Sequence, residues 1–309
     1  MPLVLEAGWV GRRVVIRRAV GGGARAQFTD TVGDLVALTG DSAHLETRTG
    51  AVRIALDSVR VARLVAPSTA EVLALESRCA RGWRAEHVDE YGGWLLRASR
   101  GFTGRANTAL PLHPPPTSLD DTLNAARAWY TVRGLPLGVQ VPLPARRRLD
   151  DALTARGFTA GPDVHVMAAR LDTVRGGRNG DVHIVASPDA AWLARFRDGT
   201  TPDAARDILV RHDRVGFAEL RRDGRTIAIG RGAVDDGWLG VTAVEVEPTW
   251  RRQGLATAVM AALWHWAAEV HGATRSYLQV TADNRPAVAL YERLGYWRHH
   301  VYRYRLERP

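Results

Sequence analysis

The stretch Val246-Glu-Pro-Thr-Trp-Arg-Arg-Gln-Gly-Leu-Ala256 joins a predicted strand to a long predicted helix. The strand begins at Trp238 and ends before Pro248, because proline cannot donate a hydrogen bond to a sheet. The helix begins near Leu255, and its first backbone N–H groups have no partner within the helix. The helix dipole adds positive charge at the same end, so the loop is a predicted anion site.

The residues of this loop are suited to close contact with an anion. Gly254 has no Cβ, which lets the backbone approach a ligand closely. Arg251 and Arg252 add charge and forked hydrogen-bond donors. The alternative is an ordinary strand-to-helix turn with two solvated arginines, since short motifs also occur by chance.

A second segment favours the anion site. Tyr277 to Asn284 reads as a strand that runs into a loop. The helix that follows has Pro286 in its first turn, where proline is tolerated, and Gly295-Tyr296 closes it. Arg298 to Leu306 reads as a last strand.

The two segments together resemble the GNAT superfamily of acyl-CoA N-acyltransferases. The pattern R-x-x-G-x-A matches Arg251, Gly254 and Ala256, and N-x-x-A-x-x-L-Y-x-x-L-G-Y matches Asn284 to Tyr296. The resemblance covers roughly Asp181 to Arg308. It implies an α+β fold with a mixed central sheet flanked by helices, and an N-acetyltransferase that moves an acetyl group from acetyl-CoA to a primary amine by direct attack.

The resemblance also implies roles for individual residues. The central strands would separate at Val246, so that backbone groups of Val244 and Val246 bind the pantetheine arm and polarise the thioester carbonyl. Asn284 would also bind the pantetheine, and Tyr291 would be the general acid that protonates the CoA thiolate. A core tyrosine is the alternative role for Tyr291. The loop residues implied in cofactor binding are Arg251, Arg252, Gln253, Gly254, Leu255, Ala256 and Thr257.

The sequence gives no evident general base. The family often places Glu or His at positions matching Gly240, Thr242 and Gln279. None of these residues has a side chain that serves as a base. Glu245 and Glu219 are therefore the candidate bases, with a water chain as the alternative. Strand alternation turns Glu245 away from Val244 and Val246 unless a bulge intervenes. No cluster has metal-ligand spacing, so no metal is expected.

The chain reads as three domains. Residues 1–66 have short, turn-bounded strands typical of an SH3-like β-barrel. Residues 67–175 read as a degenerate GNAT-like domain, because proline-rich sequence replaces the phosphate loop there. Residues 176–309 read as the GNAT domain proper. The segment Gly101 to Asn107 reads as a loop, with a place in the acceptor cleft as the alternative.

The composition of the chain limits which partners and which cellular compartment we expect. The chain has 309 residues, a formal net charge of +9 and one cysteine. All of its basic residues other than histidine are arginine, which codon bias explains better than a nucleic-acid footprint. We expect a cytoplasmic protein, since no apolar run approaches the ~18 residues of a membrane span. The barrel arginines that could bind an acidic partner are Arg12, Arg13, Arg17, Arg18 and Arg25.

A second function class stays open. In it the GNAT half is a non-catalytic acyl-CoA sensor, coupled to a barrel that binds nucleic acid or protein. The missing base favours this alternative, whereas the intact loop and Tyr291 favour the transferase. The sequence identifies neither the amine acceptor nor the oligomeric state, and a homodimer through the first GNAT-like copy is compatible with it.

Overall fold

The computed structural model describes residues 5–20, 27–174, 181–199 and 203–307. The chain forms two compact units, Met1–Ser68 and Thr69–Pro309. Within the described ranges, no helix is both long and apolar enough to cross a membrane. Arg25, one of the arginines assigned to a partner surface, lies outside these ranges.

The first unit is an antiparallel sheet with the strand order β4-β3-β2-β1-β5. The last strand returns beside the first, as the predicted barrel-like domain requires. Alternate side chains of the strands point inward. Val14, Ile16, Leu35 and Ile54 form its fully buried core. The strands are β1 (Arg13–Val20), β2 (Gln27–Leu38), β3 (Ser42–Thr47), β4 (Gly50–Ala55) and β5 (Val59–Leu64), with short 3-10 helices η1 (Ala7–Trp9) and η2 (Leu56–Ser58).

The second unit is built around one large mixed sheet, ordered β10-β17-β11-β16-β15-β14-β13-β12, with β9 also paired to β17. Its neighbouring strands are antiparallel except for the parallel pair β15 and β16. The strands are β9 (Gly138–Leu143), β10 (Thr159–Ala160), β11 (Val164–Arg170), β12 (Val182–Val185), β13 (Val215–Arg222), β14 (Arg225–Asp235), β15 (Trp238–Val246), β16 (Arg275–Thr281) and β17 (Trp297–Leu306).

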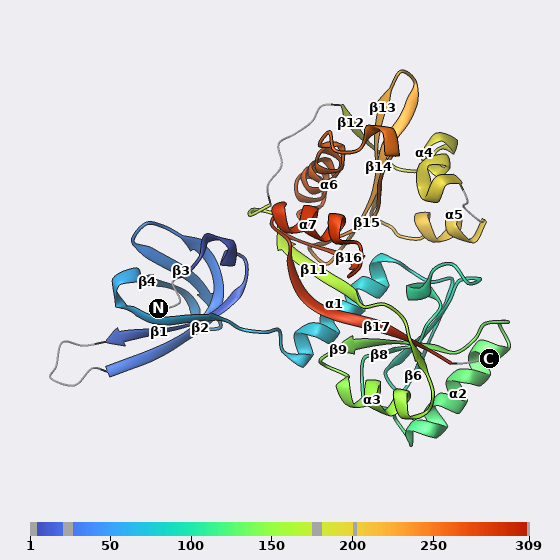
Figure 1. Cartoon of the computed structure of the whole chain (residues 1–309), viewed down its shortest axis with the longest axis horizontal. Helices are drawn as coiled ribbons and strands as arrows, with labels where there is room; N and C mark the ends of the chain where they lie inside the picture. The colour runs from blue at the N-terminus through green and yellow to red at the C-terminus, as the bar shows by residue number, and fades with distance from the viewer. Residues whose placement is uncertain (1–4, 21–26, 175–180, 200–202, 308–309) are drawn as a thin grey trace. The chain divides into compact units, whose positions relative to one another are not determined.

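We call residues 69–175 the first half of this unit and residues 176–309 the second half. Two strands of the sheet pair with strands of the other half. β11 belongs to the first half, yet it lies between β16 and β17 of the second half. β17 ends the chain and reaches β9 of the first half. Figure 1 shows β17 running alongside β11 toward β9. Neither half therefore has a complete sheet of its own, and the division at residue 175 remains a proposal.

The first half adds a small sheet and three helices. The sheet is β6-β7-β8, with β6 (His87–Tyr91), β7 (Trp94–Ala98) and β8 (Leu110–Pro111). The short helix η3 (Gly104–Ala106) lies between β7 and β8. Trp94, Tyr130 and Leu153 are fully buried in the core of this half. Its helices are α1 (Thr69–Gly82), α2 (Leu119–Thr131) and α3 (Arg147–Ala155).

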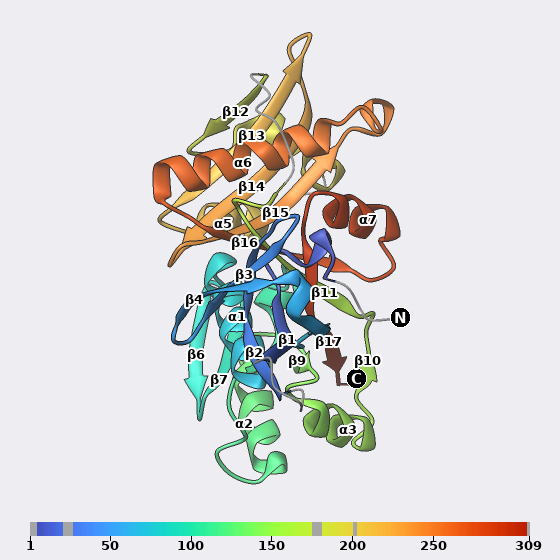
Figure 2. The ribbon, with the colours of Figure 1, turned by 90° about the vertical axis from the view of Figure 1, so that its left-hand side faces the viewer.

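Helices cover both faces of the second half's part of the sheet (Figures 1 and 2). The long helix α6 (Leu255–His271) packs through Val259, Met260 and Leu263 on β12 to β15. Trp192 and Phe217 are fully buried in a separate core under α4 (Ala190–Arg195) and α5 (Asp203–Val210). The remaining helices are η4 (Phe196–Gly199), η5 (Pro248–Trp250) and α7 (Arg285–Arg293). The predicted mixed α+β fold is confirmed.

A buried hydrogen-bond network joins the two halves. Glu76 of α1 accepts the amide of Gln140 at 2.7 Å and lies 2.9 Å from Nε2 of His300. Arg97 donates to the other end of the Gln140 amide at 2.9 Å. Because all four side chains are buried, each polar atom needs a partner inside the protein. The network thus ties α1, β7, β9 and β17 together.

Candidate acyl-transfer cleft

A β-bulge shapes the strand that leads into the phosphate loop. β14 pairs Ile229 with Glu245 and Arg231 with Thr242, so Ala243 and Val244 face one residue of the partner strand. Ala243 takes a positive φ of 54°. A bulge changes which way the following side chains point. Val244 packs toward the core under α6, whereas the Glu245 carboxylate lies on the other face, at the backbone of Arg197. Both residues line the cleft.

The parallel strands β15 and β16 separate just before this bulge. Their pairing covers Trp238 to Val241 on one side and Arg275 to Leu278 on the other, and then stops. The separation begins after Val241, earlier than the position at Val246 expected from the resemblance. Past that point the backbone groups of β15 that face β16 have no ladder partner there, so they are available to a ligand.

A cleft with a volume of about 390 Å³ lies where the two strands separate. One wall comes from β15, β16 and the start of α7. The first half also contributes lining residues, Trp83, Thr103 and Arg105. The loop from Gly101 to Asn107 therefore lies at the cleft, which is the second of the two roles considered for it from the sequence. The lining residues are Trp83, Thr103, Arg105, Phe196, Arg197, Val241, Thr242, Ala243, Val244, Glu245, Leu278, Gln279, Val280, Thr281, Asn284, Ala287 and Tyr291.

Tyr291 lines this cleft from α7. Burial raises the pKa of its phenol to about 12, so the hydroxyl is protonated at neutral pH. Its ring packs edge-on against Tyr296, with 6.1 Å between centroids. Tyr296 is itself held by hydrogen bonds with Trp264 and Ser276. The surroundings thus fix the Tyr291 ring and keep a proton on it, as a general acid requires.

Asn284 lies at the junction of the cleft and α7. Its Oδ1 accepts the backbone N–H of Ala287 at 3.3 Å and so caps the helix. Capping fixes the side chain and leaves its NH₂ group available to hydrogen-bond a ligand in the cleft.

The loop before α6 has the geometry of an anion site. Gly254 precedes the helix at φ +79°, and Arg252 also has a positive φ of 65°. Successive N–H groups in such conformations form a concave donor surface. The helix has no side-chain cap and no acidic residue in its first turn, and a Cβ on Gly254 would meet nothing within 4 Å. The residues present therefore fit a pyrophosphate.

The corresponding helix of the first half is built differently. Ser118 caps α2 by accepting the N–H of Asp121 at 3.1 Å. Asp120 and Asp121 place negative charge in its first turn. A capped helix end with acidic side chains does not attract an anion. The phosphate loop is therefore found in one half of the unit.

Of the other predicted loop residues, Arg251 is engaged locally, because its Nε donates to the carbonyl of Val246 at 3.1 Å. Val246 itself is not among the lining residues of the cleft, whereas Val244 is. Gln253 is exposed, and Leu255, Ala256 and Thr257 form the partly exposed first turn of α6.

The two carboxylates considered as bases lie in different places. Glu245 is at the cleft, where its carboxylate accepts the backbone N–H of Arg197 at 3.0 Å. Glu219 is not among the lining residues. It is buried on β13 and accepts a hydrogen bond from Arg221 at 3.0 Å. Of the two, only Glu245 is placed to take a proton from a group in the cleft.

The structure explains why the family's usual base positions are empty here. A side chain at Gly240 would collide with the Tyr277 phenol, whose oxygen lies 2.5 Å from an ideal Cβ. Thr242 accepts a hydrogen bond from the buried Arg231 at 3.4 Å, and Gln279 accepts one from Arg105 at 2.8 Å. These positions are therefore used for packing and for holding arginines.

The sequence analysis gave Arg105 a place in the cleft only as an alternative, and it gave Arg197 none. Arg105 lies over the ring of Trp83, and Arg197 lies over that of Phe102. The polar, glycine-rich run from Gly101 to Asn107 was the available signal for the first of these. No sequence signal pointed to Arg197, because it lies just after the end of helix α4.

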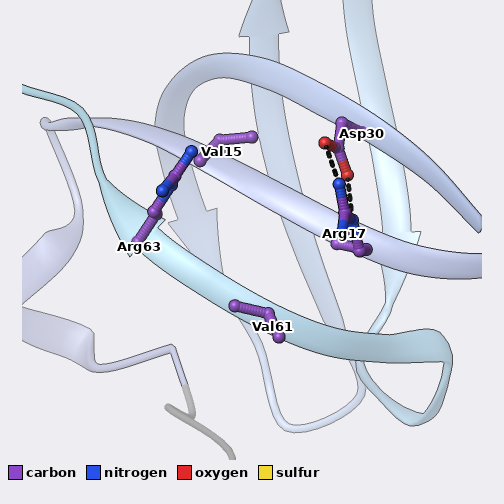
Figure 3. Close-up of a pocket in the computed structure, with 5 residues that line it drawn as sticks. All are labelled: Val15, Arg17, Asp30, Val61 and Arg63. Carbon is purple, nitrogen blue, oxygen red and sulfur yellow. Dashed lines mark hydrogen bonds and ion pairs between the residues drawn. The ribbon is translucent and has the colours of Figure 1, made fainter.

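Other groups considered from the sequence do not form a second site. Within the described ranges, no group of three or more His, Cys, Asp or Glu side chains is arranged to hold a metal. His300 belongs to the buried network, and His265 bonds its own helix. In the barrel, Figure 3 shows Arg17 in a two-bond ion pair with Asp30, at 2.8 and 2.9 Å, beside a shallow pocket. Its charge is thus neutralised locally.

Comparison with solved structures places this fold in a known class. A GCN5-related N-acetyltransferase from Kribbella flavida superposes with a TM-score of 0.61 at 20% identity, over 77% of this chain and 96% of that one. At this identity the likeness shows the fold alone, which is that of GCN5-related N-acetyltransferases.

The chain belongs to the family described as "Probable histone acetyltransferase Rv0428c C-terminal", whose model matches residues 69–305. The probable histone acetyltransferase Rv0428c of Mycobacterium tuberculosis is 29% identical over 305 residues, covering 96% of this chain and 94% of that protein. The uncharacterised N-acetyltransferase YobR of Bacillus subtilis is 27% identical over 248 residues, covering 77% and 99%. These relationships support acyl transfer as the chemistry.

Proposed function

We propose that the second unit transfers an acetyl group from acetyl-CoA to a primary amine by direct attack. The observation that carries the proposal is that the separated ends of β15 and β16, Asn284 and the protonated Tyr291 all line one cleft. The open, uncapped N-terminus of α6 follows β15 after the short helix η5, and it would supply the donors for a pyrophosphate.

Each cofactor element has a residue suited to it. The N–H groups from Arg252 to Thr257 would hold the pyrophosphate, with Arg251 and Gln253 at the rim. Backbone groups of Val244 would pair with the pantetheine arm and polarise the thioester carbonyl, since donors aimed at a developing oxyanion lower the barrier. Asn284 would hydrogen-bond the same arm.

The proposed reaction transfers the acetyl group in one step. The lone pair of the neutral amine forms the new C–N bond at the thioester carbon, and the C–S bond breaks with its electron pair on sulfur. The Tyr291 phenol gives its proton to that sulfur. The proton lost by the attacking nitrogen leaves through Glu245 or a water chain and restores the phenol. The products are an amide and CoA with a free thiol.

The acceptor panel follows from the chemistry and from the relatives. The M. tuberculosis relative is named a probable histone acetyltransferase, so basic protein segments belong in the panel beside small amines and amino acids. The runner-up function, a non-catalytic acyl-CoA sensor, predicts binding without turnover in that panel.

The test combines binding with turnover. Calorimetric titration of acetyl-CoA into the full chain should show one site per chain, and free thiol should appear with at least one class of amine. Binding without thiol release across the whole panel would favour the sensor. If acetyl-CoA does not bind, the proposed cofactor site is wrong.

A further inference from the structure

A fully buried arginine lies directly behind the cleft. Arg231 of β14 has no exposed surface. Its Nη1 donates to the hydroxyl of Thr242 at 3.4 Å, and Thr242 lines the cleft. Thr242 is also one of the positions at which the GNAT superfamily often has Glu or His. Where a base is expected, this chain therefore has a hydroxyl that is hydrogen-bonded to a cation.

Backbone carbonyls hold this guanidinium in place. Nε of Arg231 donates to the carbonyl of Leu209 at 2.7 Å, and Nη1 donates to that of Gly82 at 3.1 Å. Leu209 lies in the last turn of α5, and Gly82 is the last residue of α1. The carbonyls at the C-terminus of a helix carry partial negative charge, so they stabilise a cation without neutralising it. Within the described ranges Arg231 forms no ion pair, and its Nη2 has no hydrogen-bond partner.

The ionisable groups that the structure describes around Arg231 are neutral or of the same charge. Tyr277 on β16 and His212, just after α5, are neutral at neutral pH. Burial raises the pKa of the Tyr277 phenol and lowers that of the His212 imidazole to about 4. Arg105 from η3 is a second cation, and the two guanidinium carbons lie 4.4 and 5.2 Å from the centroid of the Trp83 ring. Burial lowers the pKa of Arg231 itself to about 9, so it stays charged at neutral pH.

The carboxylates in these surroundings are bound to other groups. Asp235 and Asp213 each form an ion pair with an arginine of or near α1, at 2.6 and 3.2 Å. Glu245, which lines the cleft, accepts the backbone N–H of Arg197, whose side chain has the opposite charge. A buried cation is usually offset by a carboxylate, because its removal from water is unfavourable. The charge of Arg231 is instead kept at full strength beside the cleft.

We infer that Arg231 is a fixed positive charge that drives the proton off the acceptor amine, so the reaction needs no strong base among the side chains of the cleft. A like charge disfavours the protonated form of an amine, and a cationic neighbour is one way in which enzymes keep an amine reactive. The inference rests on the proposed function, because it concerns the second substrate of the same reaction.

The proton balance is simple. The acceptor arrives as an ammonium ion and gives one proton to solvent, which leaves the lone pair that attacks the thioester. After the attack, the same positive charge favours loss of the second proton from nitrogen through Glu245 or a water chain. The inference thus accounts for a transferase cleft in which the usual base positions hold other residues.

A thiol placed in the cleft measures this charge without any substrate. Thr242→Cys in the full chain puts a thiol where the hydroxyl contacts Arg231. The native Cys79 does not interfere, because it is buried and burial raises its pKa well above the usual range. Only the thiolate is alkylated by iodoacetamide, so the rate between about pH 5 and 10 gives the thiol pKa. Burial alone would raise this pKa, whereas Arg231 should bring it at least about 1 pH unit below the usual ~8.5.

Further variants separate the charge from the structure. Arg231→Met, combined with Thr242→Cys, removes the charge and should return the thiol pKa to about 8.5 or above. Arg231→Lys keeps a charge and should keep the thiol pKa low. Thr281→Cys is the control with Arg231 intact, because Thr281 is an exposed residue that lines the same cleft. Its thiol should titrate near ~8.5.

The outcomes distinguish this inference from the proposed function. The same thiol pKa at position 242 with Arg231 present and in Arg231→Met would overturn the inference, even if an amine is acetylated. If Arg231→Met does not fold, the comparison of Thr242→Cys with Thr281→Cys decides, and equal thiol pKa values would overturn the inference. A low pKa that depends on Arg231, in a protein that acetylates no amine, would count against the proposed function alone.

Discussion

Arg105 of the first half donates from Nη1 to Oε1 of Gln279, across 2.8 Å, and Gln279 lies on the strand that forms one side of the cleft. The first half is thus in direct contact with the candidate site. Its sequence lacks a phosphate loop, and proline-rich sequence stands in its place. The structure adds a place in the wall of the cleft, through Trp83, Thr103 and Arg105.

The exchange of β11 and β17 predicts that the second half does not fold alone. Residues 176–309 lack β11, which lies between two of their own strands. A fragment with that gap exposes strand edges and the core beneath them. The fragment should show no cooperative thermal unfolding, while residues 69–309 should unfold cooperatively and bind acetyl-CoA. Cooperative unfolding of 176–309, together with binding, would show that the exchange is dispensable.

Arg252→Ala should weaken acetyl-CoA binding by about 1–3 kcal/mol, the scale of a charge-assisted hydrogen bond to phosphate. Alanine keeps the backbone close to the present conformation, so the loss reports the side chain. Arg148→Ala removes the same charge from an exposed site on α3 and is the matched control. Calorimetric titration measures both, and equal affinities in the two variants would move the phosphate site away from this loop.

Buried histidines should make the second unit less stable in mild acid. Burial lowers the pKa of His299 to about 3 and that of His212 to about 4. The unfolded chain takes up protons near a pKa of ~6.5, where the folded chain does not. Stability from these groups is therefore present above pH ~6.5 and is lost as the pH falls toward 4.

The pH effect is measured from thermal unfolding midpoints between pH 7 and 4. His299→Gln should flatten the dependence, because the side chain no longer takes a proton on unfolding. His183→Gln changes an exposed histidine on β12 and should leave the slope as it is. Identical slopes in all three proteins would show that His299 is not a source of the acid sensitivity.

Local sequence patterns predicted the strand and the helix on either side of the phosphate loop. The strand Trp238–Val246 and the helix starting at Leu255 are confirmed, since proline, glycine and apolar periodicity act over a few residues. Strand alternation alone does not predict the bulge at Ala243, where the register between β14 and β15 shifts. A bulge depends on the partner strand, here on Gly230, where a Cβ would lie 2.5 Å from Val259.

The long-range features were beyond local patterns. The placement of β11 between β16 and β17 follows from pairing across more than one hundred residues of chain, which no short motif encodes. For the same reason Arg197 and Arg105 could not be recognised as neighbours of one cleft. Their roles depend on which aromatic rings the tertiary fold places beneath them.

The central claim is that this cleft transfers an acetyl group with Tyr291 as the acid. The direct measurement is mass spectrometry of an amine panel incubated with ¹³C-labelled acetyl-CoA and either the wild-type chain or Tyr291→Phe. The wild type should place the label on an amine, with one free thiol for each amide. The variant should bind acetyl-CoA normally and react roughly 10²–10⁴-fold more slowly. A label that never reaches an amine, or equal rates for both proteins, would contradict the account.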